Sequence, residues 1–262
     1  MPTALRIVLW NANGLLNHKF ELQDFLDMHK IDIALISETH FTSRTVFKIP
    51  LYTVYYTTHP NDTAHGGAAV ILRSSIRHHE LLPHQSDKIH AATVQLDAHP
   101  WPLKISAIYC PPRHAIFTDD YVTLFRSLGS RFLIGGDWKA KHTAWGARLI
   151  TPKERNLLHD ISSHNCNYFN TGEPTYWPTD LTKLTDLLDF LVARGIPANY
   201  IQVESAFELS SDHSPAIATI GASTLNKAAF PTLTTTQPTG LCFVLTLTDI
   251  LTSIYASRDV RS

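Results

Sequence analysis

RFLIGGDWKAKHTAW, residues 131–145, joins a short apolar run to a group of polar and aromatic side chains. The run RFLIGG is typical of a β-strand, and Asp137 follows it directly. We expect Gly135 and Gly136 to let the backbone turn tightly, so that Asp137 points out from the strand end. An acid in this position can take part in chemistry, and Lys139 places a long cation two residues away.

Eight further apolar runs are rich in Ile, Val, Leu and Tyr and end at Gly, Pro, Asn or Asp. They predict strands at 5–10, 31–37, 52–56, 67–73, 92–96, 103–109, 186–193 and 214–220. Helical signals predict three helices, at 19–29, 119–128 and 153–163. Many strands with few helices between them indicate an α+β domain that contains two packed sheets.

The composition fits a globular protein, because 44% of the 262 residues are hydrophobic and only 17% are charged. The formal net charge of −1 gives no global sign of a nucleic-acid partner, so any such sign must be local. Three widely spaced Cys argue against a disulfide framework or a zinc–thiolate site. With no secretory signal at the start, we expect a nuclear or cytoplasmic protein that is not secreted.

The texture of the chain changes near residue 222. We expect residues 1–221 to form the folded domain and residues 222–262 to form a linker and a divergent C-terminal tail. The apolar run LCFVLTLTDILTSIYA, residues 241–256, is shorter than the ~20 residues that span a bilayer, and Asp249 interrupts it. This run favours a docking helix or strand over a membrane anchor.

Polar residues follow three of the apolar runs, at Asn11, Glu38 and Asp137, and the run Ser211-Asp212-His213 stands just before a fourth. Each one alone is most simply a turn or cap residue. Together, the three carboxylates offer the hard oxygen ligands that Mg²⁺ prefers. An amide at Asn11 could orient a carboxylate or a phosphate, and His213 could serve as an acid, a base or a phosphate contact.

Six motifs occur in a fixed order: WNANGL, SETH, IYCPP, GGDWKAKHTAWG, LLDF and SSDHSP. Over residues 5–220 the chain thereby resembles the endonuclease/exonuclease/phosphatase superfamily. Within it, the resemblance is to the apurinic-type endonuclease domain of non-LTR retrotransposons, in particular the jockey-like elements of arthropods. This resemblance implies a four-layer αββα sandwich of two packed mixed β-sheets flanked by helices, with the site at one rim. It also implies a Mg²⁺-dependent DNA endonuclease, with Mn²⁺ as an alternative ion, that nicks target DNA to prime reverse transcription.

The resemblance assigns roles to individual residues. Asn11 matches the Asn near the first strand, and Tyr109 matches the Tyr that contacts the scissile phosphate. Glu38 and Asp212 match the acids linked to the metal, and Asp137 matches the acid that aligns or activates the attacking water. His213 matches the catalytic His, and Asp189 matches the Asp that orients it. A carboxylate beside an imidazole fixes its tautomer and favours the imidazolium, so this pairing is physically reasonable.

Lys139 departs from the family pattern, which has Asn at this position. Loss of one such donor elsewhere costs about 10²–10³ in turnover. A lysine ammonium about 5 Å from Mg²⁺ would be repelled by roughly 6–7 kcal/mol at an effective dielectric near 20. Lys139 must therefore swing away, lose its proton or weaken metal binding, or it contacts the substrate phosphate and favours binding over cleavage. We expect reduced activity in this chain, typical of a defective copy.

A local basic stretch between residues 139 and 155 favours DNA phosphates, although a solvated helix face is the plainer interpretation. The candidate DNA-binding residues are Lys141, His142, Arg148, Tyr176 and Trp177. The aromatic pair could enter a groove or could pack under a loop. The expected partner is double-stranded DNA, not a membrane, and the reverse transcriptase domain of a full-length element is absent from this chain.

Two other functions stay open. One is a catalytically weak nucleic-acid-binding remnant. The other is another phosphodiesterase or phosphatase of the superfamily, such as an abasic-site repair enzyme or an inositol-phosphate phosphatase.

Overall fold

The computed structural model of this chain describes residues 4–98, 102–147, 152–180 and 182–221. The expected linker and tail at 222–262 lie outside the described residues.

Two mixed sheets form the body of the molecule. The strands of the first sheet, in spatial order, are β12 (Ile201–Ser205), β13 (Ala216–Gly221), β1 (Ala4–Asn11), β2 (Ile33–Ser37), β4 (Ala68–Arg73) and β3 (Tyr52–Thr57). Those of the second are β10 (Cys166–Phe169), β11 (Asp189–Arg194), β9 (Phe132–Asp137), β8 (Leu103–Tyr109), β7 (His90–Leu96) and β5 (His78–Glu80), with β6 (His84–Gln85) also on β7. The helices are α1 (Lys19–Met28), α2 (Thr118–Leu128) and α3 (Pro152–Ser163), and the short 3₁₀ turns are η1 (Leu15–His18), η2 (Thr143–Trp145) and η3 (Ala198–Tyr200).

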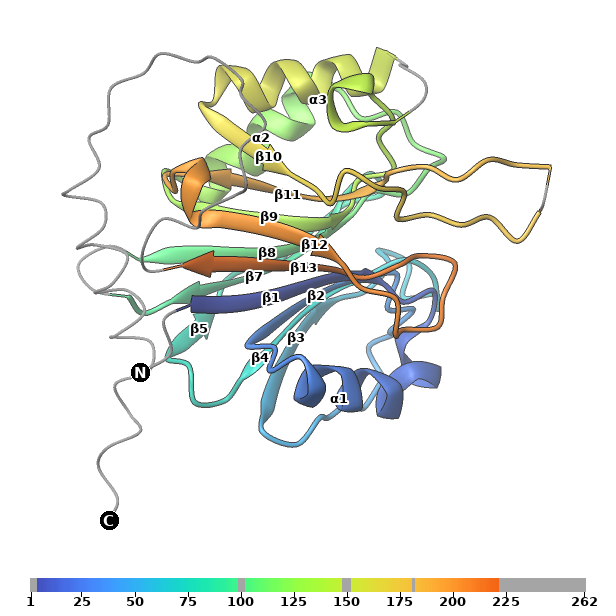
Figure 1. Ribbon diagram of the computed structural model, residues 1–262, viewed down its shortest axis with the longest axis vertical. Coiled ribbons are helices and arrows are strands. Elements are labelled where there is room, and N and C mark those ends of the chain that lie inside the picture. The colour runs from blue at the N-terminus through green and yellow to red at the C-terminus, as the bar shows by residue number, and fades with distance from the viewer. Residues whose placement is uncertain (1–3, 99–101, 148–151, 181, 222–262) are drawn as a thin grey trace.

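The two sheets pack face to face, with α1 on the outer face of the first sheet and α2 and α3 on that of the second (Figure 1). Apolar side chains such as Leu9 and Ile105 fill the space between the sheets. Phe125 of α2 joins a second cluster against the second sheet, and Phe25 of α1 joins a third against the first. These layers confirm the αββα sandwich expected from the sequence.

Each sheet contains one βαβ unit, and these two units bring polar residues to a common rim. Strands β1 and β2 are parallel, with Asn11 opposite Ser37 at their carboxyl ends. Strands β8 and β9 are also parallel, with Tyr109 opposite Asp137 at theirs. The antiparallel neighbour β11 begins at Asp189, which also lies opposite Asp137. Since the carboxyl ends of parallel strands share one edge, residues far apart in sequence meet there.

Gly135 and Gly136 do not form a tight turn, because both lie within β9. A Cβ on Gly135 would lie 2.4 Å from Leu9 Cδ2, and one on Gly136 would lie 2.2 Å from the Ile108 carbonyl oxygen. Close to this point, the Ser37 hydroxyl bridges the sheets by donating to that carbonyl at 2.8 Å and accepting from the Asp137 N–H at 2.9 Å. The glycines therefore allow the two sheets to approach each other closely beside Asp137.

Four observed strands, β5, β6, β10 and β12, were not predicted from the sequence. Strands β5 and β6 have three and two residues and consist largely of His, Gln and Glu. Strands β10 and β12 have four and five residues and lie at sheet edges. Short polar or edge strands lack the apolar run by which buried strands are recognised.

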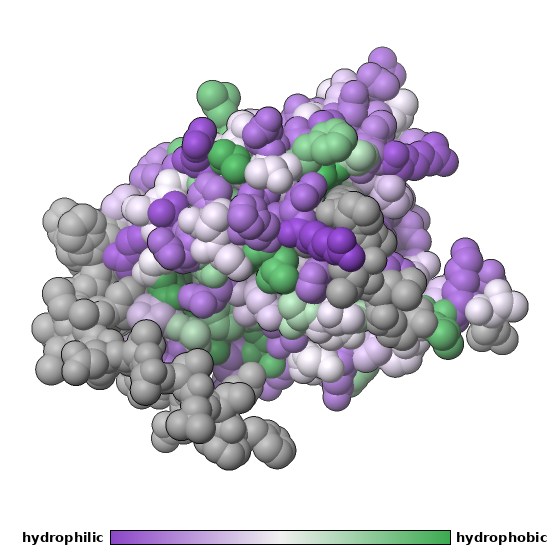
Figure 2. Space-filling model, turned by 90° about the horizontal axis from the view of Figure 1, so that it is seen from above, coloured by the Kyte–Doolittle hydropathy of each residue, from purple (hydrophilic) through white to green (hydrophobic). Residues whose placement is uncertain are grey.

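The face seen from above, over α2 and α3, is mostly hydrophilic, with only separate apolar spots (Figure 2). Within the described ranges, each helix is too short or too polar to cross a bilayer.

Candidate active site

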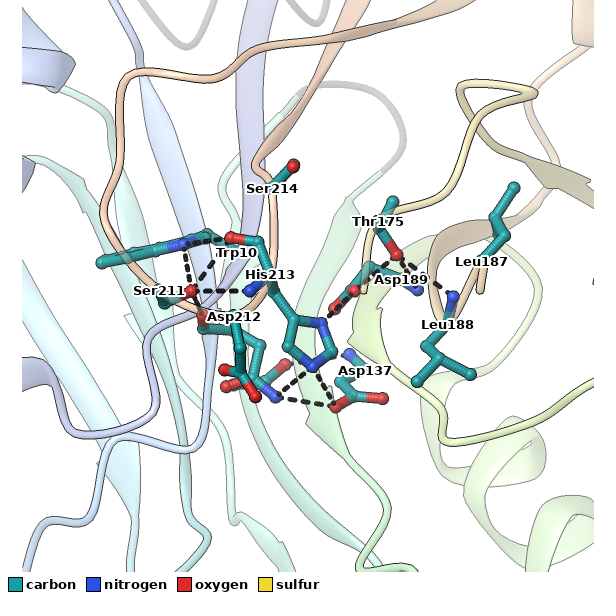
Figure 3. Close-up of polar contacts among 12 residues, drawn as sticks. Trp10, Asp137, Thr175, Leu187, Leu188, Asp189, Ser211, Asp212, His213 and Ser214 are labelled. Carbon is teal, nitrogen blue, oxygen red and sulfur yellow. Dashed lines mark hydrogen bonds and ion pairs between the residues drawn. The ribbon is translucent and has the colours of Figure 1, made fainter. Parts of the chain in front are cut away.

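A buried hydrogen-bond chain of Thr175, Asp189 and His213 forms what we term the imidazole half of the site (Figure 3). His213 Nδ1 lies 2.6 Å from Asp189 Oδ2, and the Thr175 hydroxyl donates to the same carboxylate oxygen at 2.7 Å. Thr175 also accepts the backbone N–H groups of Leu188 and Asp189 at 3.1 Å each. Because Nδ1 of His213 donates to the Asp189 carboxylate, the other ring nitrogen, Nε2, faces the rest of the site.

The loop that carries His213 is fixed to β1. The Ser211 hydroxyl donates to the Asn11 carbonyl at 2.7 Å and accepts from the His213 N–H at 3.0 Å. The Trp10 indole N–H lies 3.1 Å from both the Ser211 hydroxyl and the His213 carbonyl (Figure 3). These contacts place the His213 imidazole next to the Asn11 amide, which lies 202 positions earlier in the chain.

Asn11 links the imidazole half to two further acids. Its Nδ2 lies 2.9 Å from Glu38 Oε1, 2.7 Å from Asp137 Oδ2 and 3.5 Å from His213 Nε2. Asn11 and Asp137 are buried, whereas the side chain of Glu38 retains 16% of its exposure. Asn11 can thus orient both carboxylates, as the sequence suggested.

Glu38, Asp137 and Lys139 form the second part, which we term the cation half. The Lys139 ammonium lies 2.7 Å from Asp137 Oδ2, 3.3 Å from Glu38 Oε1 and 3.4 Å from His213 Nε2. Both Glu38 and Lys139 adopt left-handed backbone conformations, with φ of 52° and 44°. Non-glycine residues in this region are strained, and such strain gathers at functional sites.

Burial and charge shift the pKa values of these groups in opposite ways. Burial alone raises the pKa of Glu38, but a hydrogen bond from His40 and the charge of Lys139 outweigh it and lower the pKa to about 2. Burial lowers the pKa of Lys139, but the carboxylates of Asp137 and Glu38 raise it further than that, so the amine is held charged. Burial likewise lowers the pKa of His213, and Asp189 more than offsets this, so the imidazolium is favoured.

Tyr109 lies close to Glu38 and Asp137. Burial and the nearby charges of Glu38 and Asp137 raise its pKa, so the phenol stays protonated and can donate to an oxyanion. Tyr109 and Glu38 also face a cavity of about 310 Å³, whose other walls include His40, His59 and Arg113. Of the acids in the site, Glu38 is the one that lines this cavity.

Asp212 lies beside His213 in the chain, but its own carboxylate makes a different contact. Its Oδ1 accepts from Asn13 Nδ2 at 3.4 Å in an exposed position, and its backbone carbonyl accepts from the Trp177 N–H at 2.7 Å. The buried group with converging ligand atoms consists of Asp137, Asp189 and His213. The metal role of Asp212 therefore stays a prediction.

The candidate DNA-binding residues have mixed surroundings. The Lys141 ammonium pairs with the buried Asp186 at 2.9 Å, and His142 caps η2 by accepting from the Ala144 N–H. The Tyr176 ring lies 4.9 Å from the His213 ring, and Trp177 is 45% exposed. Arg148 lies outside the described residues.

Comparisons with known proteins identify the family of this chain. The family described as endonuclease-reverse transcriptase matches residues 103–217. An RNA-directed DNA polymerase from the mobile element jockey of Drosophila melanogaster is 35% identical over 226 residues, which are 86% of this chain and 25% of that protein. The chain belongs to the endonuclease/exonuclease/phosphatase superfamily.

A probable RNA-directed DNA polymerase from transposon X-element of the same species is 30% identical over 260 residues, covering 98% of this chain and 29% of the relative. The chain thus spans about a quarter of the length of the curated relatives it matches.

Solved structures show that this superfamily fold is shared. The endonuclease domain of TRAS1, a telomere-specific non-LTR retrotransposon, superimposes with a TM-score of 0.69 at 19% identity, over 83% of this chain and 98% of that one. An AP endonuclease, LMAP, from Leishmania major gives a TM-score of 0.66 at 12% identity, over 84% and 88% of the two chains.

The donor atoms of this superfamily member suit a hard divalent cation, because carboxylate oxygens of Glu38 and Asp137 converge on one point. The same two oxygens are the ones that contact the Lys139 ammonium. Glu38 and Asp137 therefore offer the oxygen ligands that a divalent ion needs. The Lys139 ammonium, however, already contacts these oxygens.

Sequence reasoning missed the supporting roles of Thr175, Ser37 and Ser211. Thr175 directly precedes Tyr176 and Trp177, and Ser211 belongs to the polar run Ser211-Asp212-His213. Each supplies a hydroxyl to a residue distant in the chain, 14 positions away for Thr175 and 200 for Ser211. The patterns of isolated strands and helices hold no signal for such long-range pairs.

Proposed function

We propose that this chain is the metal-dependent DNA endonuclease part of a non-LTR retrotransposon, which nicks target DNA and leaves a 3′ hydroxyl to prime reverse transcription. The observation that carries the proposal is the meeting of strand ends from both sheets, where the Asn11 amide contacts the carboxylates of Glu38 and Asp137 and lies 3.5 Å from Nε2 of His213. The relatives that are RNA-directed DNA polymerases of mobile elements support the biological setting. The reverse transcriptase would belong to the longer element.

The residues of the site divide the work of phosphodiester hydrolysis. Asp137, held by Asn11, aligns the attacking water and accepts its proton. His213 faces the phosphate with Nε2 while Asp189 stabilises its charged form, and Tyr109 donates to a phosphate oxygen. Glu38, with Asp137, would hold a Mg²⁺ or Mn²⁺ ion, which supplies positive charge to the phosphate and to the leaving 3′ oxygen.

The DNA would lie across the rim where both βαβ units end. The cavity between Tyr109 and Arg113 takes the strand on one side of the scissile phosphate. Tyr176 and the exposed Trp177 contact it on the other. His142 and Arg148 add contacts to DNA phosphates, and Lys141 does so if its pair with Asp186 opens. Lys139 lowers cleavage relative to an Asn at the same position.

Nicking of supercoiled plasmid tests the proposal. We expect slow conversion to open circles in Mg²⁺, none in EDTA, and none for Glu38→Ala. Lys139→Asn should nick at least about tenfold faster than wild type, because it restores an amide donor to the site and removes a cation that repels the divalent ion. A wild type that already equals Lys139→Asn would contradict the effect of Lys139.

The same assay separates the other functions. DNA binding without Mg²⁺-dependent nicking, in wild type and in Lys139→Asn, would identify a binding remnant. Preference for abasic oligonucleotides or for phosphoinositides over plasmid would identify another hydrolase of the superfamily.

A further inference from the structure

The Lys139 ammonium contacts the carboxylates of both Asp137 and Glu38. Its distances of 2.7 Å to Asp137 Oδ2 and 3.3 Å to Glu38 Oε1 are those of ion pairs. These oxygens are also the ones that Asn11 orients. We infer that Lys139 is a tethered cation that competes with the divalent ion for Glu38 and Asp137, so that the ion binds only after the lysine side chain has moved away.

This inference rests on the proposed metal-dependent function, and it concerns affinity rather than rate. An acid pair already neutralised in part by one ammonium attracts a second cation less strongly. The incoming ion must also displace the existing ion pairs, whose atoms are largely shielded from water. Both effects lower the affinity for a divalent ion.

Lys139 is not a flexible surface lysine. Its side chain is 16% exposed, whereas that of Lys183, on the loop between β10 and β11, is 67% exposed. The backbone N–H of Lys139 donates to Asp137 Oδ1 at 2.8 Å, so one residue contacts both oxygens of that carboxylate. The Tyr176 ring adds a cation–π contact, with its centroid 5.5 Å from Nζ. Several contacts must therefore break together before the side chain leaves.

The backbone at position 139 favours an amide residue. Its φ of 44° lies in the left-handed region, which Asn tolerates better than Lys. Lys139→Asn therefore removes the competing charge without adding backbone strain, which makes it the informative substitution.

Direct binding of Mn²⁺, followed by the electron paramagnetic resonance signal of the free ion, tests the inference without any cleavage. We expect Lys139→Asn and Lys139→Met to bind Mn²⁺ roughly tenfold or more tightly than wild type, because each removes the competing charge. Lys139→Arg keeps the charge and should bind as weakly as wild type. Lys88→Asn is the matched control, since Lys88 pairs with Asp120 at 2.8 Å away from the site, and it should leave Mn²⁺ affinity unchanged.

Thermal unfolding of wild type and Lys139→Asn, with and without Mg²⁺, adds a second measurement that needs no DNA. A ligand that binds only the folded state stabilises it by RT ln(1 + [L]/Kd), which is close to zero when the concentration lies well below Kd. About 1 mM Mg²⁺ should therefore leave the wild-type melting temperature unchanged and should raise that of Lys139→Asn. Equal Mn²⁺ affinity in wild type and Lys139→Asn, or a wild type stabilised by about 1 mM Mg²⁺, would overturn the inference. If affinity differs as expected but no variant nicks DNA, the proposed function fails and the inference stands.

Discussion

The imidazole half and the cation half of the site share one rim but are held in different ways. In the imidazole half, His213 and Asp189 are buried, and Thr175 fixes the carboxylate through its hydroxyl. In the cation half, Glu38 and Lys139 leave strand ends in left-handed conformations and meet through charge. The first half is set by hydrogen bonds that the fold imposes, whereas the second depends on which side chain occupies one loop position.

The largest expected effect would break the imidazole half. In the Lys139→Asn background, Asp189→Asn should reduce nicking by about 10²–10³, because an amide does not stabilise the imidazolium of His213. The imidazolium is lost as pH rises through the raised pKa of His213, so the substitution should also move this loss of activity to lower pH. Rates of plasmid nicking measured across pH would show both changes.

Asp97→Asn is the matched control for this prediction. Asp97 also pairs with a His, with Oδ1 2.8 Å from His79 Nδ1, but both side chains are about half exposed. Its removal should leave nicking unchanged. An Asp189→Asn enzyme that nicks at the parental rate with the same pH profile would show that His213 needs no partner.

A second experiment measures the strength of the cation half in the absence of metal. The pKa of Glu38 is lowered from 4.5 to about 2, and a lowered carboxyl pKa contributes stability above its unfolded value. That stability is lost as pH falls from about 4.5 through about 2. The free energy of unfolding should therefore fall by roughly 2–3 kcal/mol more in wild type than in Glu38→Gln over this range.

Urea unfolding in EDTA at several pH values provides the measurement. Parallel pH dependences for the two proteins would mean that the carboxylate of Glu38 is no better stabilised in the folded chain than in the unfolded one.

The smallest expected effect concerns the ion pair between Lys141 and Asp186, which belongs to neither half of the site. Its partner Asp186 has no exposed side-chain surface, while the Lys141 side chain is 35% exposed. Lys141→Met should lower the free energy of unfolding by about 1–2 kcal/mol, discounted for solvent screening, and leave the salt dependence of DNA binding unchanged. If Lys141 instead binds phosphate, the slope of log K against log salt should fall by about one.

The apolar runs, such as that of β9, predicted the buried strands and the two packed sheets, and the family resemblance supplied the four αββα layers. The sequence also named Asn11, Glu38 and Asp137, since strand ends in parallel pairs converge regardless of their distance in the chain. It interpreted Gly135 and Gly136 as a turn, because the approach of a second sheet is not visible in one strand. The contacts of Lys139 with Glu38 and Asp137 could not be predicted either, because the sequence allows the long lysine side chain several orientations.

The seam between the sheets at Gly136 limits which substitutions the architecture of this site can accept. A side chain at that position would meet the Ile108 carbonyl oxygen and the Ser37 hydroxyl, so a change there pushes apart the two layers that carry the reacting groups. Three residues further on, at Lys139, the chain has left β9, so a substitution there changes the charge beside Asp137 and Glu38. A substitution at position 139 therefore alters the chemistry of the site, whereas one at position 136 alters its architecture.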